Sequence, residues 1–111
     1  MPDRDMRAAS ASHSLLTRVK TALLAMQRHS WEQGVAAQAF YESGDEDVLV
    51  AMAREAALRQ LPDGRLAMVG GAEAVTDPSA NGEPVLRAAE ITGDHALREA
   101  AERQLDWLLA V

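Results

Sequence analysis

An all-α fold is predicted by three features of this chain of 111 residues. Apolar residues recur every three or four positions along most of its length, and no segment shows the sustained alternation of a strand. Alanine is frequent, which favours helices that pack closely. A glycine followed by an aspartate joins two helical patterns twice, at Gly44-Asp45 and at Gly93-Asp94. We therefore expect helices paired as antiparallel hairpins, arranged as a solenoid or as part of a closed α/α toroid.

Five helices are predicted in chain order. They cover about residues 15–26, 31–43, 46–61, 82–92 and 95–109. Ser30 and Gln33 match the capping-box pattern at the start of the second helix. In each Gly-Asp pair, the glycine is expected to end one helix in a left-handed conformation and the aspartate to cap the next helix. Pro84 is tolerated because it falls in the first turn of the fourth helix.

Two segments fall outside these helices. Residues 1–12 are mostly small and polar and are expected to form a disordered leader, so the folded domain is predicted to span residues 13–111. A Pro-Asp-Gly sequence at residues 62–64 ends the third helix. Residues 65–80, which contain two adjacent glycines and a proline, are predicted to be the longest irregular segment.

The two Gly-Asp pairs belong to an internal repeat of 49 residues, counted from Gly44 to Gly93. Alignment at this spacing places Val48 opposite Leu97. A tetratricopeptide repeat has a period of about 34 residues, so the longer spacing favours hairpins of the toroid type.

Composition and charge exclude several classes of function. The formal net charge is −6 and the 11 basic residues are dispersed, which argues against nucleic-acid binding. No apolar run is long enough to span a membrane. The chain has no cysteine and its three histidines are scattered, so no metal site or cofactor is expected. The charged N-terminal residues do not resemble a signal peptide, so a cytoplasmic location is expected.

Two polar segments interrupt the alanine- and leucine-rich pattern at points where a loop turns into a helix. They are residues 29–34, His-Ser-Trp-Glu-Gln-Gly, and residues 76–82, Thr-Asp-Pro-Ser-Ala-Asn-Gly. The start of a helix presents free backbone N–H groups and the positive end of the helix dipole, which favour an anionic ligand. Two such starts on neighbouring helices could line one pocket, so these segments are the candidate binding site.

Five side chains in these segments are candidates, and most of them also have a purely structural interpretation. Trp31 either stacks on a sugar ring or packs the start of its helix. Glu32 and Gln33 are candidates to bind a ligand, and Gln33 is equally suited to be the capping-box partner of Ser30. Asp77 precedes a proline in the longest loop, where it either acts in catalysis or bonds the backbone of its own turn. Asn81 either binds substrate or only begins the fourth helix.

Taken together, these segments resemble the N-terminal part of the unsaturated glucuronyl and rhamnogalacturonyl hydrolases, glycoside hydrolase families 88 and 105. The resemblance covers residues 15–110. It rests on the Trp-Glu-Gln-Gly sequence at 31–34, on Asp77 shortly before Gly82, and on the Glu-Ile-Thr-Gly-Asp sequence at 90–94. It implies a six-hairpin (α/α)6 barrel and hydration of the 4,5-double bond of a terminal unsaturated uronic acid. It also implies that Asp77 assists at that sugar and that Trp31 lines its site.

The resemblance further implies that the principal acid/base aspartate of these enzymes lies in later hairpins. A six-hairpin barrel needs roughly 300 residues. The chain is therefore expected to be an N-terminal fragment that is inactive alone and self-associates through uncovered apolar faces. The implied ligand is an oligosaccharide with an unsaturated uronic acid end. Two alternatives stay open: a helical-hairpin repeat that binds or scaffolds another protein without catalysis, and a plain helical bundle that dimerises.

Overall fold

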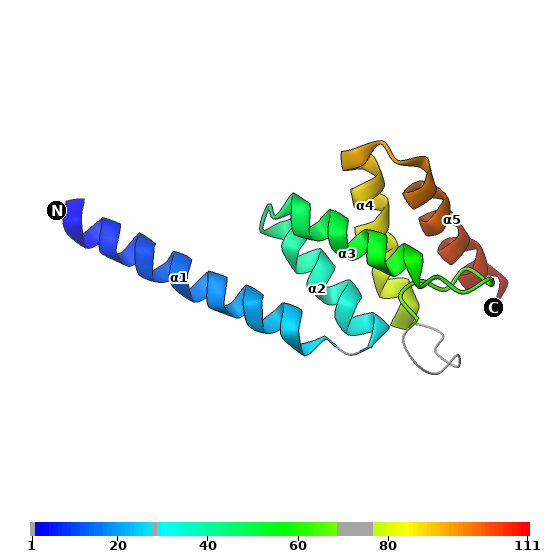
Figure 1. Ribbon diagram of the computed structural model, residues 1–111, viewed down its shortest axis with the longest axis horizontal. Coiled ribbons are helices and arrows are strands. Elements are labelled where there is room, and N and C mark those ends of the chain that lie inside the picture. The colour runs from blue at the N-terminus through cyan, green and yellow to red at the C-terminus, as the bar shows by residue number, and fades with distance from the viewer. Residues whose placement is uncertain (1, 28, 69–76) are drawn as a thin grey trace.

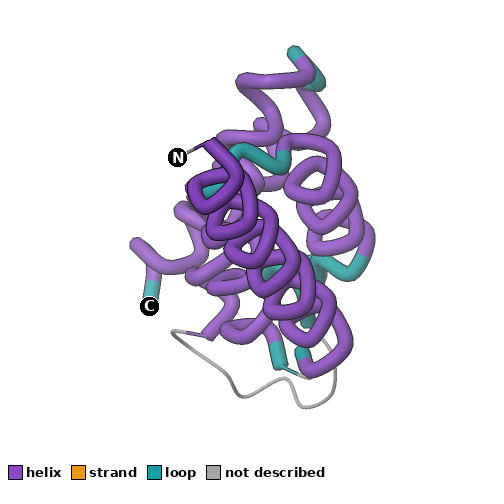
Figure 2. Tube along the Cα trace, turned by 90° about the vertical axis from the view of Figure 1, so that its left-hand side faces the viewer, coloured by secondary structure: helices purple, strands orange, loops and turns teal. Residues whose placement is uncertain are grey.

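The computed structural model describes residues 2–27, 29–68 and 77–111, and these residues form helices and connecting loops but no strand (Figure 1, Figure 2). The helices are α1 (Pro2–Met26), α2 (Ser30–Glu42), α3 (Glu46–Leu58), α4 (Gly82–Thr92) and α5 (His95–Ala110). A short 3-10 helix, η1 (Asp77–Asn81), directly precedes α4. The predicted all-α fold is thus confirmed, while closure into a toroid stays a prediction.

Helices α2 to α5 pack into one array, and α1 extends from one end of it (Figure 1). Each helix of the array packs on the next one along the chain, and η1 lies against α2. Phe40 of α2 and Leu49 of α3 belong to one buried cluster, to which α1 adds the partly buried Leu23. Leu66 and Val85 belong to a second buried cluster, where α3, α4 and α5 meet. The core therefore lies within α2–α5, and α1 is peripheral to it.

The residues expected to form a disordered leader are helical. Residues 2–12 make up the first turns of α1, which runs without interruption from Pro2 to Met26. Alanine at positions 8, 9 and 11 favours the helix, and Pro2 occupies the first turn, where a missing N–H removes no helical hydrogen bond. The helix therefore begins well before residue 13, where the sequence predicts the domain to start.

The buried faces of the helices repeat at 48 residues rather than 49. The corresponding buried residues of α3 and α5 are Leu49 with Leu97, Met52 with Ala100, Ala53 with Ala101, and Ala56 with Gln104. The predicted pairing of Val48 with Leu97 is therefore wrong by one residue. The joints explain this difference, because Gly44 follows the buried Phe40 by four positions, whereas Gly93 follows the corresponding Ala88 by five.

The two Gly-Asp joints share a left-handed glycine but differ in length and in the role of the aspartate. Gly44 and Gly93 have φ angles of 81° and 70°, the predicted conformation. Asp94 caps α5 as predicted, since its carboxylate accepts the N–H of Ala96 at 2.9 Å. Asp45 precedes α3 without a capping bond from its side chain. Gly93 directly follows the last residue of α4, whereas Ser43 stands between the last residue of α2 and Gly44.

The segment that follows α3 is irregular, as predicted, and is partly buried. The helix ends at Leu58 rather than Leu61, because the proline at position 62 disfavours helical backbone at the residue before it. Residues 64–67 are buried, and the N–H of Leu66 donates to Oε1 of Gln104 at 2.8 Å. This part of the predicted loop therefore belongs to the core, and it ties the end of α3 to α5.

Candidate functional site

The starts of α2 and α4 lie against each other. The amide Nδ2 of Asn81 donates to the backbone oxygen of Ser30 at 2.7 Å. Gly34, one turn into α2, approaches Ala80 so closely that a Cβ at position 34 would lie 2.5 Å from the carbonyl carbon of Ala80. The two polar segments singled out in the sequence are therefore in contact, apart from Thr76, which lies outside the described residues.

The start of α2 is capped differently from the prediction. His29 precedes the first helical residue, and its N–H donates to Oε1 of Glu32 at 3.2 Å. Glu32 therefore has the capping role that the sequence assigns to Gln33, and Ser30 is a buried residue inside the helix. The predicted pair of Ser30 and Gln33 is wrong by one residue. The Glu32 carboxylate lies at the positive end of the α2 dipole, where it partly offsets the field that would attract an anion.

Gln33 and Asn81 are buried and connect the helices. Gln33 is 6% exposed, and its Nε2 donates to the backbone oxygen of Met52 in α3 at 3.3 Å. Asn81 is 1% exposed and binds α2 through Ser30. Both amides therefore have the partners expected of structural residues, and both stand at corresponding places of the 48-residue repeat.

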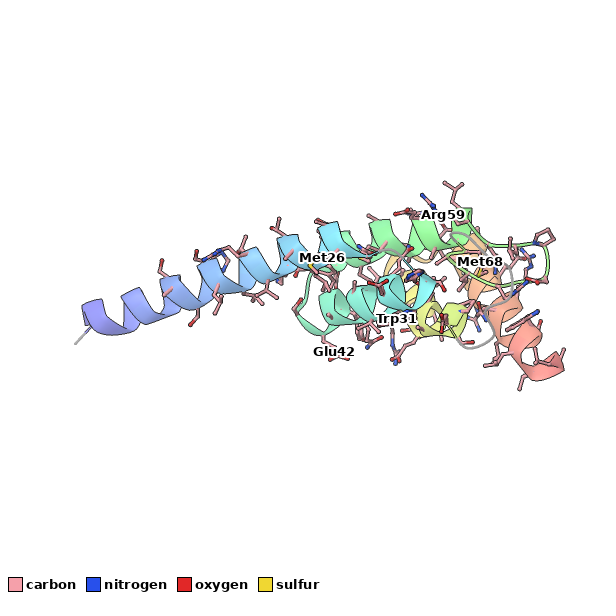
Figure 3. All side chains as sticks on the ribbon, turned by 90° about the horizontal axis from the view of Figure 1, so that it is seen from below. Met26, Trp31, Glu42, Arg59 and Met68 are labelled. Carbon is pink, nitrogen blue, oxygen red and sulfur yellow. The ribbon has the colours of Figure 1, made fainter. Side chains whose placement is uncertain are left out.

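Trp31 lies at the mouth of a groove between α1 and α2. Its side chain is half-exposed, and Met26 at the end of α1 lies close by in the same groove (Figure 3). The groove has a volume of about 230 Å³ and is lined by Leu23, Met26, Gln27, Trp31, Glu32 and Val35. Because most of this lining is apolar, Trp31 packs in the groove at the start of α2, and stacking of its exposed part on a sugar ring stays a prediction.

Asp77 is the first described residue after the gap in the chain and begins η1. It is partly exposed, whereas Pro78 beside it is buried. Since η1 packs on α2, Asp77 belongs to the element that carries Asn81 to Ser30. The structure thus brings the element that bears Asp77 to the start of the helix that bears Trp31 and Glu32.

A second groove, which was not predicted from the sequence, lies between α4 and α5. Its volume is about 330 Å³. Its lining includes the small residues Gly82 and Ala101 and the leucines Leu86, Leu105 and Leu108. None of the five candidate side chains lines it. The signal that could have revealed it is the leucine run at the end of α5, which exceeds what one buried helix face requires.

Three aspartates outside the candidate site form ion pairs. Asp45 pairs with Lys20 of α1, Asp94 with Arg54 of α3, and Asp63 with Arg65. In each case the hydrogen bond from the basic side chain is the largest cause that lowers the pKa of the aspartate. These carboxylates are therefore held charged by their partners, which is the behaviour of structural ion pairs.

Two general features of the described residues bear on chemistry. Within them, no three histidine, aspartate or glutamate side chains gather closely enough to hold a metal ion. No helix among them has the length and apolar character needed to cross a membrane.

Comparisons with known proteins leave the family resemblance as a prediction. No protein-family model matches the chain, and searches of curated proteins and of solved structures returned no match. The residues of the candidate site and their contacts are therefore the observations that bear on function.

Proposed function

We propose that this chain is the N-terminal segment of an α/α-hairpin glycoside hydrolase that acts on oligosaccharides ending in a 4,5-unsaturated uronic acid. The observation that supports this proposal best is the contact between the starts of α2 and α4. Two helix starts at one place offer N–H groups and positive dipole ends to the carboxylate of a uronic acid, and Glu32 offsets part of this field at α2. The half-exposed Trp31 in the first turn of α2 offers an aromatic face to a sugar ring.

The roles proposed for the individual residues follow from their exposure. Trp31 and Glu32 are accessible enough to contact a sugar, and Asp77 is partly exposed on the neighbouring element. Gln33 and Asn81 are proposed to shape the site by holding α2 against α3 and η1, because both are buried. In this proposal, Asp77 assists as a proton-transfer group while water adds to the double bond of the sugar.

The reaction implied by the resemblance needs a second aspartate from further hairpins. That residue protonates the vinyl ether carbon and activates water, and the hemiketal that forms then opens to release the sugar. We therefore expect the 111-residue chain alone to leave the ultraviolet absorbance of the unsaturated uronic acid unchanged. No cofactor or metal is part of this chemistry, and a cytoplasmic location belongs to the same proposal.

Binding of the sugar by this chain tests the proposal directly. Trp107→Phe leaves Trp31 as the only tryptophan, so its fluorescence reports on the α1–α2 groove. Titration with an unsaturated uronyl disaccharide should change this fluorescence, and the saturated disaccharide should change it less. Asp77→Asn should weaken binding, whereas Asp106→Asn, at an exposed position of α5, should leave it unchanged. Equal responses to both sugars and to both substitutions would reject the site.

A second function is supported by a different observation. The apolar groove between α4 and α5 is suited to side chains of another polypeptide rather than to a charged sugar. A helical-hairpin module that binds or scaffolds a protein without catalysis is therefore the alternative proposal. The two functions are separated by the ligand, since a disaccharide that perturbs Trp31 favours the hydrolase, and a polypeptide that occupies the α4–α5 groove favours the binding module.

A further inference from the structure

Two apolar surfaces of the chain are exposed, one on α1 and the other between α4 and α5 (Figure 1). The first is on α1, where Leu15, Val19 and Met26 are 61%, 54% and 67% exposed. Their spacing of four and seven residues places them on one stripe of the helix. The second is the α4–α5 groove, where Leu105 is 53% exposed. Each surface contains several exposed apolar side chains, whereas isolated ones are normal on a protein surface.

The two surfaces match in shape. The groove is lined by small residues, Gly82 and Ala101, and by leucines. A volume of about 330 Å³ accepts a few apolar side chains from one face of a helix rather than a whole helix. The stripe on α1 offers such a face, because its large side chains project from a helix that extends beyond the array (Figure 1). Ridges of one helix that enter the groove between two others are the usual form of helix packing.

The two surfaces also match in charge. From residue 13 to 26, α1 carries Arg18 and Lys20 and no acidic residue. Helices α4 and α5 carry five acidic and three basic residues, and Glu83 and Glu102 lie at the groove itself. Glu83 and Glu102 pair with Arg87 and Arg98 of their own helices at 3.5 and 3.2 Å, and Lys20 pairs with Asp45, so the match is one of net charge. The net charges near the two surfaces are opposite, which favours their association over the pairing of two α1 helices with like charges.

One chain cannot join these surfaces to each other, because α1 packs on α2 and runs along the long axis of the molecule away from α5 (Figure 1). We propose that α1 of one copy docks into the α4–α5 groove of a second copy. The contact is head-to-tail, so each copy retains one free α1 and one free groove. Such a heterologous contact continues into longer chains unless its rotation closes a ring. The proposal concerns the chain of 111 residues and does not rest on the proposed function.

Two charge-bearing variants test this arrangement in the full chain. Val19→Glu blocks the α1 stripe, and Leu105→Glu blocks the groove. Both positions are exposed, so folding should survive, and circular dichroism checks this. Sedimentation should show concentration-dependent association of the unmodified chain. Each variant alone should associate at least about tenfold more weakly, the effect of losing one good apolar contact.

The decisive measurement is the mixture of the two variants. The Leu105→Glu chain keeps an intact α1, and the Val19→Glu chain keeps an intact groove, so a 1:1 mixture should form a heterodimer that grows no further. Ser14→Glu on the other side of α1 and Ala110→Glu at the end of α5 are the matched controls, and both should associate like the unmodified chain. If Leu105→Glu still self-associates normally, two α1 helices pair instead. An unmodified chain that stays monomeric at high concentration would also overturn the proposal.

Discussion

The starts of α2 and α4 occupy corresponding places in the 48-residue repeat, yet they are built differently. Gly34 and Gly82 correspond, but a Cβ at position 34 would meet the backbone of Ala80 at 2.5 Å, whereas a Cβ at position 82 would meet only Cγ of Gln104 at 4.0 Å. Gln33 and Asn81 also correspond, and each donates to a different neighbouring element. The two repeats therefore share a pattern of buried residues. The residues that differ at equivalent positions make the contacts between neighbouring helices.

The largest effect is expected from substitution of the first of these glycines. Gly34→Ala places a methyl group against backbone that cannot rotate away, so it should lower the free energy of unfolding by about 1–3 kcal/mol. Gly82→Ala is the matched control, and it should change stability by less than about 1 kcal/mol, because the space is open and alanine favours helices. Urea denaturation measures both. Equal losses for the two variants would mean that the close approach of α2 to η1 is not a constraint.

Substitution of the two buried amides, Asn81 and Gln33, should also lower stability to different extents. Asn81→Leu removes a 2.7 Å bond to Ser30 and should destabilise the chain by about 1–3 kcal/mol, the usual consequence of breaking a buried hydrogen bond. Gln33→Leu removes a longer bond of 3.3 Å and should have a smaller effect. The midpoint of thermal unfolding compares them. If both substitutions leave the midpoint unchanged while weakening binding of the unsaturated sugar, the amides act on the ligand and not on the fold.

Local chemistry accounts for what the sequence could predict. Gly93 and Asp94 end one helix and cap the next through contacts within a few residues, so their roles followed directly from the sequence. The start of α2 was misplaced by one residue because Ser30, like His29, could precede the helix, and only packing against Asn81 turns Ser30 inward. Where a residue type suits two local structures, contacts with distant residues decide which structure forms.

Long-range contacts account for what the sequence could not predict. Leu66 is buried because its N–H meets Gln104, which lies 38 residues away, and nothing in the loop itself signals this. The α4–α5 groove depends in the same way on the relative positions of Leu86 and Leu105. The sequence indicated that two helix starts could line one pocket, and these starts are in contact, but it did not indicate that Gln33 is buried against α3 and Asn81 against α2.

The smallest effects on stability are expected from substitution of the aspartates in the two joints. These substitutions compare the contribution of α1 with that of the array. The pKa of Asp94 is lowered mainly by the hydrogen bond from Arg54 and also by the N–H of Ala96. The pKa of Asp45 is lowered mainly by Lys20 and then by the hydroxyl of Ser43. A folded-state pKa below the unfolded value means that the stabilisation is present above the unfolded value, 3.8, and is lost as the pH falls through the folded value.

Replacement of each aspartate by asparagine removes this pH-dependent part and keeps the shape of the side chain. Asp94→Asn should lower the unfolding midpoint of the whole array at neutral pH, because Arg54 ties α3 to the joint between α4 and α5. Asp45→Asn should leave that midpoint nearly unchanged, since Lys20 ties down only the peripheral α1, but it should speed hydrogen exchange in α1. Both differences from the unmodified chain should vanish in acid, where the native carboxylates are protonated as well. A midpoint lowered equally by the two substitutions would show that α1 is as much a part of the cooperative unit as α5.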